Sequence, residues 1–322
     1  MQVKEIYEVV AEDFARVNAL ILEQLHSDVP MVEKIGHYII ESGGKRMRPL
    51  LVLLCARALN KAGDDKALLA GVIEFLHTAT LLHDDVVDTS DLRRGRPTAN
   101  AKWGNAPSVL VGDFLYSRAF QMMVSLRDLK VMEILSNATC VIAEGEVLQL
   151  MNVKNPDTSE AKYMDVIKGK TAMLFEASSH SAAVLSQASA ADEDALRRYG
   201  HHLGMAFQLI DDILDYQGST AELGKNVGDD LAEGKPTLPL IYAMANASSD
   251  DAQLIRQAIR KGGVEHLEQI CKIVQDCGAL DYTLQKALAE RDAAKACLQN
   301  LPDSPAKSAL SALADIAVDR RS

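Results

Sequence analysis

The sequence predicts an all-α protein. Hydrophobic residues make up 48% of the 322 positions, with many Leu, Ala and Met, whereas aromatic residues account for only 5%. Gly and Pro, which interrupt regular structure, occupy 19 and 9 positions. This composition favours helices and carries little strand signal. No stretch has the composition of a linker, so we expect residues 1–322 to form a single domain with a sizeable core.

The first helices follow from apolar stripes and turn residues. Apolar residues at helical spacing predict a helix over 1–26, and Pro30 is well placed to begin a second one. That helix stops at Ser42-Gly43-Gly44, which leads into the basic segment 45–48. Basic residues that follow a glycine pair and precede a helix are well placed to meet an anion, because backbone N–H groups point the same way.

The remaining helices are expected in close succession. They are predicted at roughly 49–61, 66–88, 107–126, 129–151, 159–187, 192–216 and 236–246. From residue 250 the chain is Ala-rich and helical, with breaks at Gly262-Gly263 and between Pro302 and Pro305. This last part carries no recognisable chemistry.

Charge and cysteine usage exclude several functions. The net charge of -11 argues against a nucleic-acid partner, which would require a basic surface. The N-terminus has no signal-peptide core, and no uncharged apolar run approaches the length of a transmembrane segment. The 5 cysteines show no metal-like spacing and fit a reduced, cytoplasmic protein.

Two aspartate clusters, each at the end of an apolar helix, carry the clearest chemical signal. Asp84 and Asp88 lie one turn apart, about 6 Å along the axis, with Asp85 beside them, and the pattern returns at 211–215. One such cluster could be a solvated helix end, but two followed by basic residues indicate a shared metal site. Carboxylates suit Mg²⁺ or Mn²⁺, and Mg²⁺ prefers to share oxygens with a phosphate. The expected ligand is therefore a diphosphate.

Two other phosphate-related motifs are disfavoured. Gly169-Lys170-Thr171 ends like a P-loop, but Met164 stands where the first glycine of that motif is required, and no strand precedes it. His83-Asp84 also occurs in His-Asp metal phosphohydrolases, yet that chemistry needs further histidines, and this helix end supplies aspartates instead.

The chain resembles the trans-isoprenyl diphosphate synthases at motifs that occur in the order typical of that family. These are GGKRMRP (43–49), LHDDVVD (82–88) with RRG (93–95), GD (112–113), KT (170–171), QLIDDILD (208–215) and GKPT (234–237). Two further stretches, IAEGEVLQL (142–150) and GKNVGDDL (224–231), are most similar to the octaprenyl-forming bacterial branch. The resemblance implies an isoprenoid-synthase-type helical bundle around a central cavity.

The resemblance also implies roles for individual residues. An allylic diphosphate, with farnesyl diphosphate the expected primer, would be held through Mg²⁺ by Asp84, Asp85, Asp88, Asp211, Asp212 and Asp215. Its other contacts would be Arg93, Lys170, Gln208, Lys225 and Lys235, with Thr171 beside Lys170. Isopentenyl diphosphate would bind without metal at Lys45, Arg48, His77 and Arg94. An isolated helical histidine is more often structural, and the family match reverses that expectation for His77.

Product length is expected to depend on small residues just before the first cluster. Short-chain members of the family carry a bulky aromatic residue four or five positions before the first aspartate, where this chain has Thr80 and Ala79. Small residues there would leave a tunnel open. We expect its floor at Met123 and its walls at Leu76 and Ile73, although ordinary core packing explains Met123 equally well.

These features predict a prenyltransferase that makes a long polyprenyl diphosphate, and this product would supply the side chain of a quinone. The enzyme is expected to form a homodimer. The loop from Gly224 to Gly228 is the candidate lid over the site. Two alternatives remain: a class I terpene cyclase, and a non-catalytic subunit of a heteromeric prenyl synthase. The sequence leaves transient membrane contact open but shows no basic amphipathic anchor.

Overall fold

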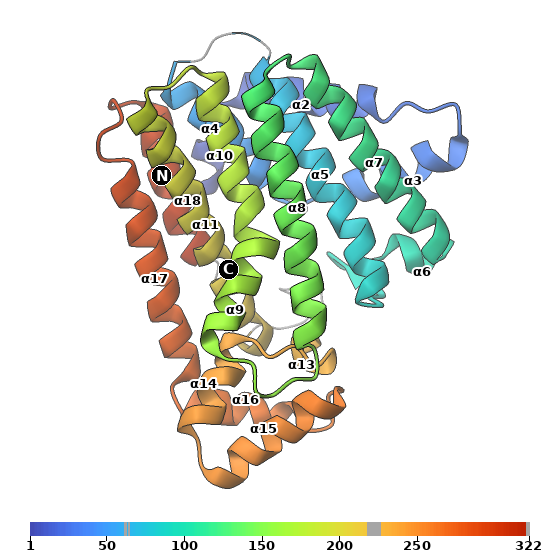
Figure 1. The fold of residues 1–322 in the computed structure, drawn as a ribbon, viewed down its shortest axis with the longest axis vertical. Coiled ribbons are helices and arrows are strands. Elements are labelled where there is room, and N and C mark those ends of the chain that lie inside the picture. Colours follow the sequence, from blue (N-terminus) through green and yellow to red (C-terminus); the bar gives the residue numbers. More distant parts are fainter. Residues whose placement is uncertain (61–62, 64, 218–226, 320–322) are drawn as a thin grey trace. The chain divides into compact units, whose positions relative to one another are not determined.

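The computed structural model describes residues 1–60, 63, 65–217 and 227–319. Within these residues the regular secondary structure is helical apart from one short hairpin, which confirms the all-α prediction (Figure 1). The described helices include none that is long and apolar enough to cross a membrane. The chain divides into two compact units, and the prediction of a single domain over 1–322 stays a prediction.

The first unit contains Met1–Asn137, Leu174–Gly200 and Cys297–Leu313. Its elements are α1 (Val3–Glu8), α2 (Ala11–Gln24), α3 (Pro30–Glu41), α4 (Met47–Ala58), α5 (Asp65–Val87), β1 (Leu92–Arg93), β2 (Arg96–Pro97), α6 (Ala99–Trp103), α7 (Asn105–Ser125) and most of α10 (Met173–Leu185).

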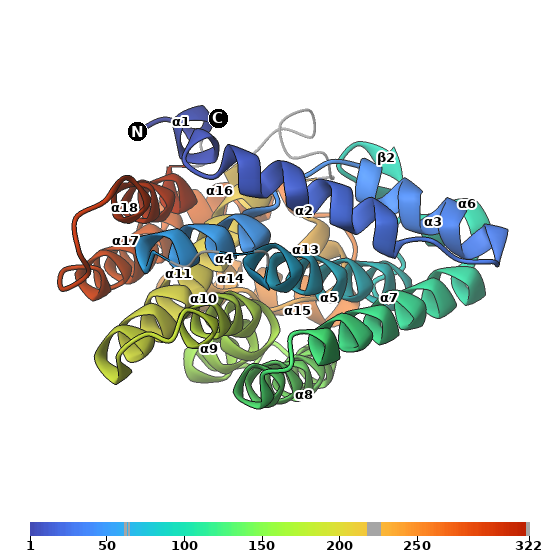
Figure 2. The ribbon, with the colours of Figure 1, turned by 90° about the horizontal axis from the view of Figure 1, so that it is seen from above.

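The core of this unit is centred on α5. This helix packs against α2, α4 and α7, and Figure 2 shows it between α4 and α7. Side chains such as Leu69, Ile73 and Phe75 are fully buried, and α4 is buried over nearly its whole length. A helix that is apolar on all sides is stable only inside a core, which explains why both helices lie there. The aspartates at the end of α5 are thereby attached to a helix that is buried in the core of the unit.

The second unit contains Ala138–Met173, His201–Ala296 and Ala314–Ser322. The helices that lie in it wholly or in part are α8 (Leu129–Asn152), α9 (Glu160–Ile167), the π-helix η1 (Lys168–Ala172), α11 (Ala190–Gln217), α13 (Asp229–Ala232), α14 (Leu238–Asn246), α15 (Ser249–Lys261), α16 (Leu267–Asp276), α17 (Ala279–Cys297) and α18 (Pro305–Val318).

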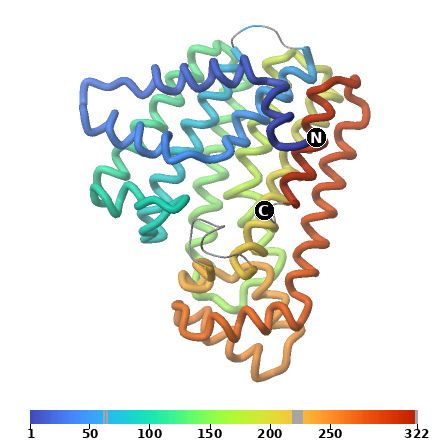
Figure 3. The backbone as a smooth tube through the Cα atoms, turned by 180° about the vertical axis from the view of Figure 1, so that it is seen from behind, coloured from blue at the N-terminus to red at the C-terminus, as the bar shows by residue number. Residues whose placement is uncertain are grey.

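A separate apolar cluster holds the second unit together. It includes Leu209, Ile213, Leu240, Ile259 and Val274, all of which are buried. Helices α14, α15 and α16 pack on one another and form the group drawn in orange in Figure 3. The second aspartate cluster lies on α11, whose apolar side contributes to this core.

Some predicted helices are divided. The prediction of one helix over 1–26 is wrong, because α1 and α2 are separated at Val10, which leaves helical geometry with φ -126°. Two adjacent β-branched valines weaken the helix at this point. The predicted helix over 159–187 is interrupted by η1, and Gly278, with φ 78°, ends α16 where no break was expected.

The polar segment after the first aspartate cluster forms a hairpin that was not predicted. Arg93 pairs with Arg96 across the two strands, and Arg94 and Gly95 form the turn with φ of 52° and 72°. Two successive residues with positive φ are the geometry of a tight hairpin turn. The turn directs the three arginines of this segment to different surroundings.

Candidate active site

The first aspartate cluster forms the end of α5. The N–H of Asp88 donates to the carbonyl of Asp84 at 2.7 Å, so these residues lie one turn apart as predicted. Asp85 is fully buried, and Arg93 donates to both of its oxygens, with Nη2 at 2.7 Å from Oδ1 and Nε at 3.1 Å from Oδ2. Metal binding by Asp85 and substrate binding by Arg93 would both compete with this ion pair.

The predicted isopentenyl diphosphate residues come together in the same unit. Arg48 Nη1 lies 3.2 Å from His77 Nε2, and its guanidinium lies 4.2 Å from the centre of the Phe175 ring. A Cβ atom added to Gly44 would lie 2.5 Å from Cζ of Arg94, so this arginine rests directly on the glycine turn. Lys45 is fixed through its backbone carbonyl, which accepts a hydrogen bond from the Tyr7 hydroxyl. Their role in binding stays a prediction.

His77 is held neutral by its surroundings. Burial lowers the pKa of this imidazole well below its ordinary value of 6.5, and the positive charges of Arg48 and Arg94 lower it further. A neutral imidazole has one nitrogen that accepts, and Arg48 is a permanent donor. The positive charge of this group therefore comes from the arginines and Lys45, and His77 orients Arg48.

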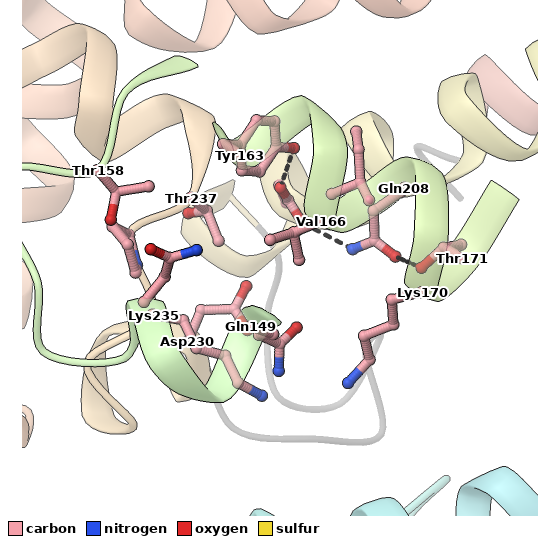
Figure 4. Close-up of a pocket in the computed structure, with 14 residues that line it drawn as sticks. Gln149, Thr158, Tyr163, Val166, Lys170, Thr171, Gln208, Asp230, Lys235 and Thr237 are labelled. Carbon is pink, nitrogen blue, oxygen red and sulfur yellow. Dashed lines mark hydrogen bonds between the residues drawn. The ribbon is translucent and has the colours of Figure 1, made fainter. Parts of the chain in front are cut away.

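The second aspartate cluster borders a cavity of about 140 Å³, shown in Figure 4. Of the predicted residues, Lys170, Thr171, Gln208, Asp212 and Lys235 line it. Thr171 donates to Gln208 Oε1 at 2.8 Å, and Gln208 Nε2 donates to Asp212 Oδ1 at 2.8 Å. The structure thus joins three predicted residues, from two different helical segments, into one hydrogen-bonded chain.

Tyr163 completes this chain and was not predicted. Its buried hydroxyl donates to Asp212 Oδ2, the oxygen that Gln208 leaves open (Figure 4). Burial and the neighbouring charge of Asp212 raise the pKa of Tyr163 well above 10.0, so the phenol keeps its proton. Both carboxylate oxygens of Asp212 are therefore oriented by neutral donors. The signal in the sequence was weak, because a tyrosine in an amphipathic helix usually belongs to the core.

The π-helix aims Lys170 and Thr171. Gly145 of α8 and Gly169 of η1 are in direct backbone contact, since a Cβ on Gly145 would lie 2.7 Å from the Lys170 nitrogen. The extra residue of a π-turn shifts the side chains that follow it relative to a regular helix. Lys170 Nζ reaches Glu146 Oε2 at 2.8 Å, and Thr171 reaches Gln208.

Negative charge accumulates around Asp212 in the way a cation site requires. Burial raises the pKa of Asp212 well above 3.8, and the charges of Asp230 and Asp211 raise it further, against the hydrogen bonds from Tyr163 and Gln208. Asp215 is also buried and accepts from the Asp230 N–H at 3.2 Å. Such crowding is relieved by a bound cation, and carboxylate oxygens fit Mg²⁺.

The described side chains contain no group of three Asp, Glu, His or Cys arranged to hold a metal ion. This arrangement is compatible with Mg²⁺, which is commonly bound by one or two carboxylates while waters and substrate phosphates supply the other ligands. The assignment of six aspartates as metal ligands stays a prediction.

Most of the predicted chain-length residues are buried, and Thr80 is half-buried. Leu76 and Ala79 on α5 and Met123 on α7 have exposures of 2%, 0% and 0%, and these two helices pack together. The Thr80 hydroxyl donates to the carbonyl of His77 at 2.7 Å. None of them lines the cavity around Lys170, and the tunnel stays a prediction.

Part of the predicted site lies outside the described residues. Lys225, assigned to the allylic diphosphate, is among them, as are Gly224 and Asn226 of the candidate lid. Lys235, which is assigned to the same diphosphate, is described and forms an ion pair with Glu233.

Comparison with known proteins identifies the family. The polyprenyl synthetase family matches residues 29–275. Octaprenyl diphosphate synthase of Escherichia coli (strain K12) is 56% identical over 321 residues, covering 99% of each chain. The geranyl-diphosphate-specific all-trans-nonaprenyl-diphosphate synthase of Rhodobacter capsulatus is 49% identical over 318 residues, covering 98% of each.

A solved structure agrees over the full length. The polyprenyl synthase from Caulobacter crescentus CB15, complexed with calcium and isoprenyl diphosphate, has a TM-score of 0.97 and 46% identity, and the match covers 100% of this chain and 98% of that one. Family, sequence and fold therefore agree. The chain belongs to the polyprenyl synthetase family and is a prenyltransferase.

Proposed function

We propose that this chain is a long-chain trans-polyprenyl diphosphate synthase with an octaprenyl product. It adds isopentenyl diphosphate by 1'-4 condensation to an allylic primer such as farnesyl diphosphate, and its product becomes the side chain of a quinone such as ubiquinone. The 56% identity to the Escherichia coli octaprenyl enzyme supports the chain length, while the nonaprenyl relative at 49% shows that similar sequences serve a neighbouring length.

The observation that carries this proposal is the presence of two chemically different anion-binding groups within the first unit. Asp84 and Asp88 offer hard oxygens for a metal, whereas Arg48, His77 and Arg94 supply cationic and neutral donors. One substrate loses its diphosphate in the reaction and the other keeps it, so the two diphosphates need these two different environments. A terpene cyclase binds one diphosphate and has no use for the second group.

The aspartates serve the substrate that loses its diphosphate. Bound Mg²⁺ would offset the charge on the departing diphosphate and so favour breaking the allylic C–O bond. The residues that would hold it are Asp84, Asp85, Asp88, Asp211, Asp212 and Asp215, and Mn²⁺ fits the same oxygens. Lys170 and Lys235 would add permanent positive charge to the same diphosphate.

The basic group serves the substrate that keeps its diphosphate. Lys45, Arg48 and Arg94 would bind isopentenyl diphosphate and direct its C3–C4 double bond at the allylic cation. A new C–C bond forms at the allylic carbon, and the positive charge moves to C3. The proton then leaves C2 for an oxygen of the released diphosphate, and its bonding electrons form the new double bond. No protein nucleophile takes part.

One incubation tests the proposal. Purified protein with Mg²⁺, farnesyl diphosphate and labelled isopentenyl diphosphate should form a labelled polyprenyl diphosphate, sized after dephosphorylation, and chelation with EDTA should abolish its formation. A cyclic hydrocarbon would identify a class I terpene cyclase. Absence of incorporation would favour a non-catalytic subunit of a heteromeric prenyl synthase.

The proposal includes a homodimer in the cytoplasm. Support for the homodimer comes from exposed apolar side chains on α7, including Leu110 and Val124. Support for the compartment comes from the cysteines, all of which are free thiols. Release of the apolar product through transient contact with a membrane surface is part of the same proposal.

A further inference from the structure

Glu74 is a buried acid in the apolar middle of α5. It is 7% exposed, and the flanking Ile73 and Phe75 have no exposed surface. Burying a carboxylate is unfavourable unless positive charges or hydrogen bonds compensate. A residue of this kind in a core helix therefore calls for partners, and they are supplied by the basic segment and the hairpin.

Arg46 lies next to this carboxylate, and the charges of Arg48 and Arg94 act on it. Arg46 Nε lies 3.8 Å from Glu74 Oε1, and His77, one turn further along α5, lies 3.2 Å from Arg48. Burial raises the pKa of Glu74, while the charges of Arg46, Arg48 and Arg94 oppose that rise. No hydrogen-bond donor among the described residues reaches Glu74 Oε2, so this oxygen interacts with the arginines through charge alone.

The arginines need such a counter-charge. Burial lowers the pKa of Arg94, the charges of Arg93 and Arg46 lower it further, and Glu74 raises it. Arg46 begins α4 in the left-handed region, with φ 40° and ψ 46°, and its guanidinium also donates to Asn18 and to the carbonyl of Ile40. Without an acid in their midst, these guanidinium groups would repel one another and move apart.

We propose that Glu74 is a positioning residue of the isopentenyl diphosphate subsite, where its carboxylate holds Arg46, Arg48 and Arg94 in place before the substrate arrives. This inference rests on the proposed function. Because Glu74 is buried in a core helix, it acts on the substrate through the arginines and not by direct contact. The negative charge of Glu74 weakly opposes the binding of a diphosphate. In this proposal, the affinity gained by holding the three arginines in place exceeds that loss.

The test is Glu74→Gln, which keeps the size of the side chain and removes its charge. The KM for isopentenyl diphosphate should rise about tenfold, equivalent to about 1.4 kcal/mol, while the KM for farnesyl diphosphate changes less than about twofold. Equilibrium dialysis of labelled isopentenyl diphosphate without Mg²⁺ should show the same loss of affinity. Glu74→Asp, which retains the charge, should recover part of it.

Asp13→Asn is the matched control. Asp13 is also a buried acid of the first unit, 8% exposed, with Arg57 Nε at 2.6 Å and Lys66 Nζ at 3.3 Å. Its replacement should lower the melting temperature without changing the KM for isopentenyl diphosphate. A general effect of losing a buried charge would move both variants alike.

Several outcomes would overturn the inference. One is a folded Glu74→Gln enzyme with an unchanged or lower KM for isopentenyl diphosphate. If Glu74→Gln does not fold, Glu74→Asp decides, because its displaced carboxylate must raise this KM at least about threefold. Wild-type protein in the same assay separates the two proposals. An inactive wild type removes the proposed function, whereas an active wild type beside an unaffected variant removes only the role of Glu74.

Discussion

Ala79 has no exposed surface on α5 and lies five positions before Asp84. A phenol ring at this position would occupy the space that we assign to the growing chain, so Ala79→Tyr should shorten the main product by several isoprene units. Overpacking of the core should cost about 1–3 kcal/mol of stability. Thin-layer chromatography of the dephosphorylated products measures the first effect, and thermal unfolding measures the second.

Met123→Ala tests the other end of the same tunnel. Removing this fully buried side chain from α7 should lengthen the product if Met123 forms the floor. Simple core packing predicts a loss of about 2–5 kcal/mol without a change in product length. Unchanged chain lengths in both Ala79→Tyr and Met123→Ala would contradict the tunnel assignment.

His77 makes stability depend on pH. Its pKa is lower in the folded than in the unfolded chain, so the unfolded chain binds the proton more readily. The contribution of His77 is fully present above about pH 6.5 and is lost as the pH falls towards the folded pKa. In His77→Gln, urea unfolding between about pH 7.5 and about pH 5.5 should show a flatter decline than in wild type. Parallel declines would show that His77 does not titrate in this way.

Single residues were predictable where a motif named their chemistry. Asp84, Arg48, Lys170 and Gln208 stand in such motifs, and the structure joins each to a predicted neighbour or to the cavity. Tyr163 escaped prediction because its role depends on a tertiary hydrogen bond between residues that are distant in sequence.

At the scale of elements, the π-helix η1 depends on the close approach of Gly145 and Gly169. Gly145→Ala would place a methyl group 2.7 Å from the Lys170 nitrogen, so the two helices must separate or η1 must rewind. We expect a loss of about 1–3 kcal/mol of stability and at least about a tenfold loss of kcat/KM. Thermal unfolding and steady-state kinetics measure these effects.

Gly71→Ala is the control for Gly145→Ala, because Gly71 is also a glycine within a helix. Its nearest neighbour would be the terminal carbon of Met122, 3.0 Å away, at the end of a flexible side chain that can move. This variant should retain its kinetics. Wild-type kinetics in Gly145→Ala would show that the backbone contact does not aim Lys170 and Thr171.

Elements with a clear apolar period were predicted almost to their ends, as α5, α7 and α14 show. The π-helix could not be predicted, because it results from contact with another helix. The hairpin could have been found from Arg94-Gly95, since an αL-tolerant pair between short extended segments indicates a tight turn. Helical periodicity alone also cannot show where two neighbouring helices such as α1 and α2 divide.

At the scale of the whole molecule, the first unit exposes apolar side chains along α7 and just after it. Leu110, Val124 and Leu129 are 65%, 57% and 83% exposed, and the first two share one side of α7 about four turns apart. Exposed apolar residues gathered on one helix mark an interface. Leu110→Glu should therefore shift the homodimer to monomer, as measured by size-exclusion chromatography with light scattering.

Leu22→Glu is the control for this surface variant. Leu22 lies on α2, is 49% exposed, and should tolerate the charge without a change in mass. A wild-type protein that elutes as a monomer would contradict the homodimer directly. Equal masses for wild type and Leu110→Glu would show instead that the dimer uses another surface.

The helical class of the molecule was predictable because composition and period act over the whole chain. Its division into two compact units was not, because both units are built from segments distant in sequence and several long helices pass from one to the other. No linker composition marks such a division.

The hydrogen-bonded chain from Thr171 through Gln208 to Asp212 has a direction. When Asp212 is ionised it can only accept, so Gln208 must present its amide N–H₂ there and its carbonyl to Thr171. The Thr171 proton is thereby committed to Gln208, and the threonine can turn only the negative end of its hydroxyl dipole to the cavity it lines. The orientation of the Gln208 amide thus determines the sign of the electric field that a short-lived carbocation would meet. Gln208→Glu preserves the shape of the side chain but lacks the N–H₂, so it would no longer fix the direction of the Thr171 hydroxyl.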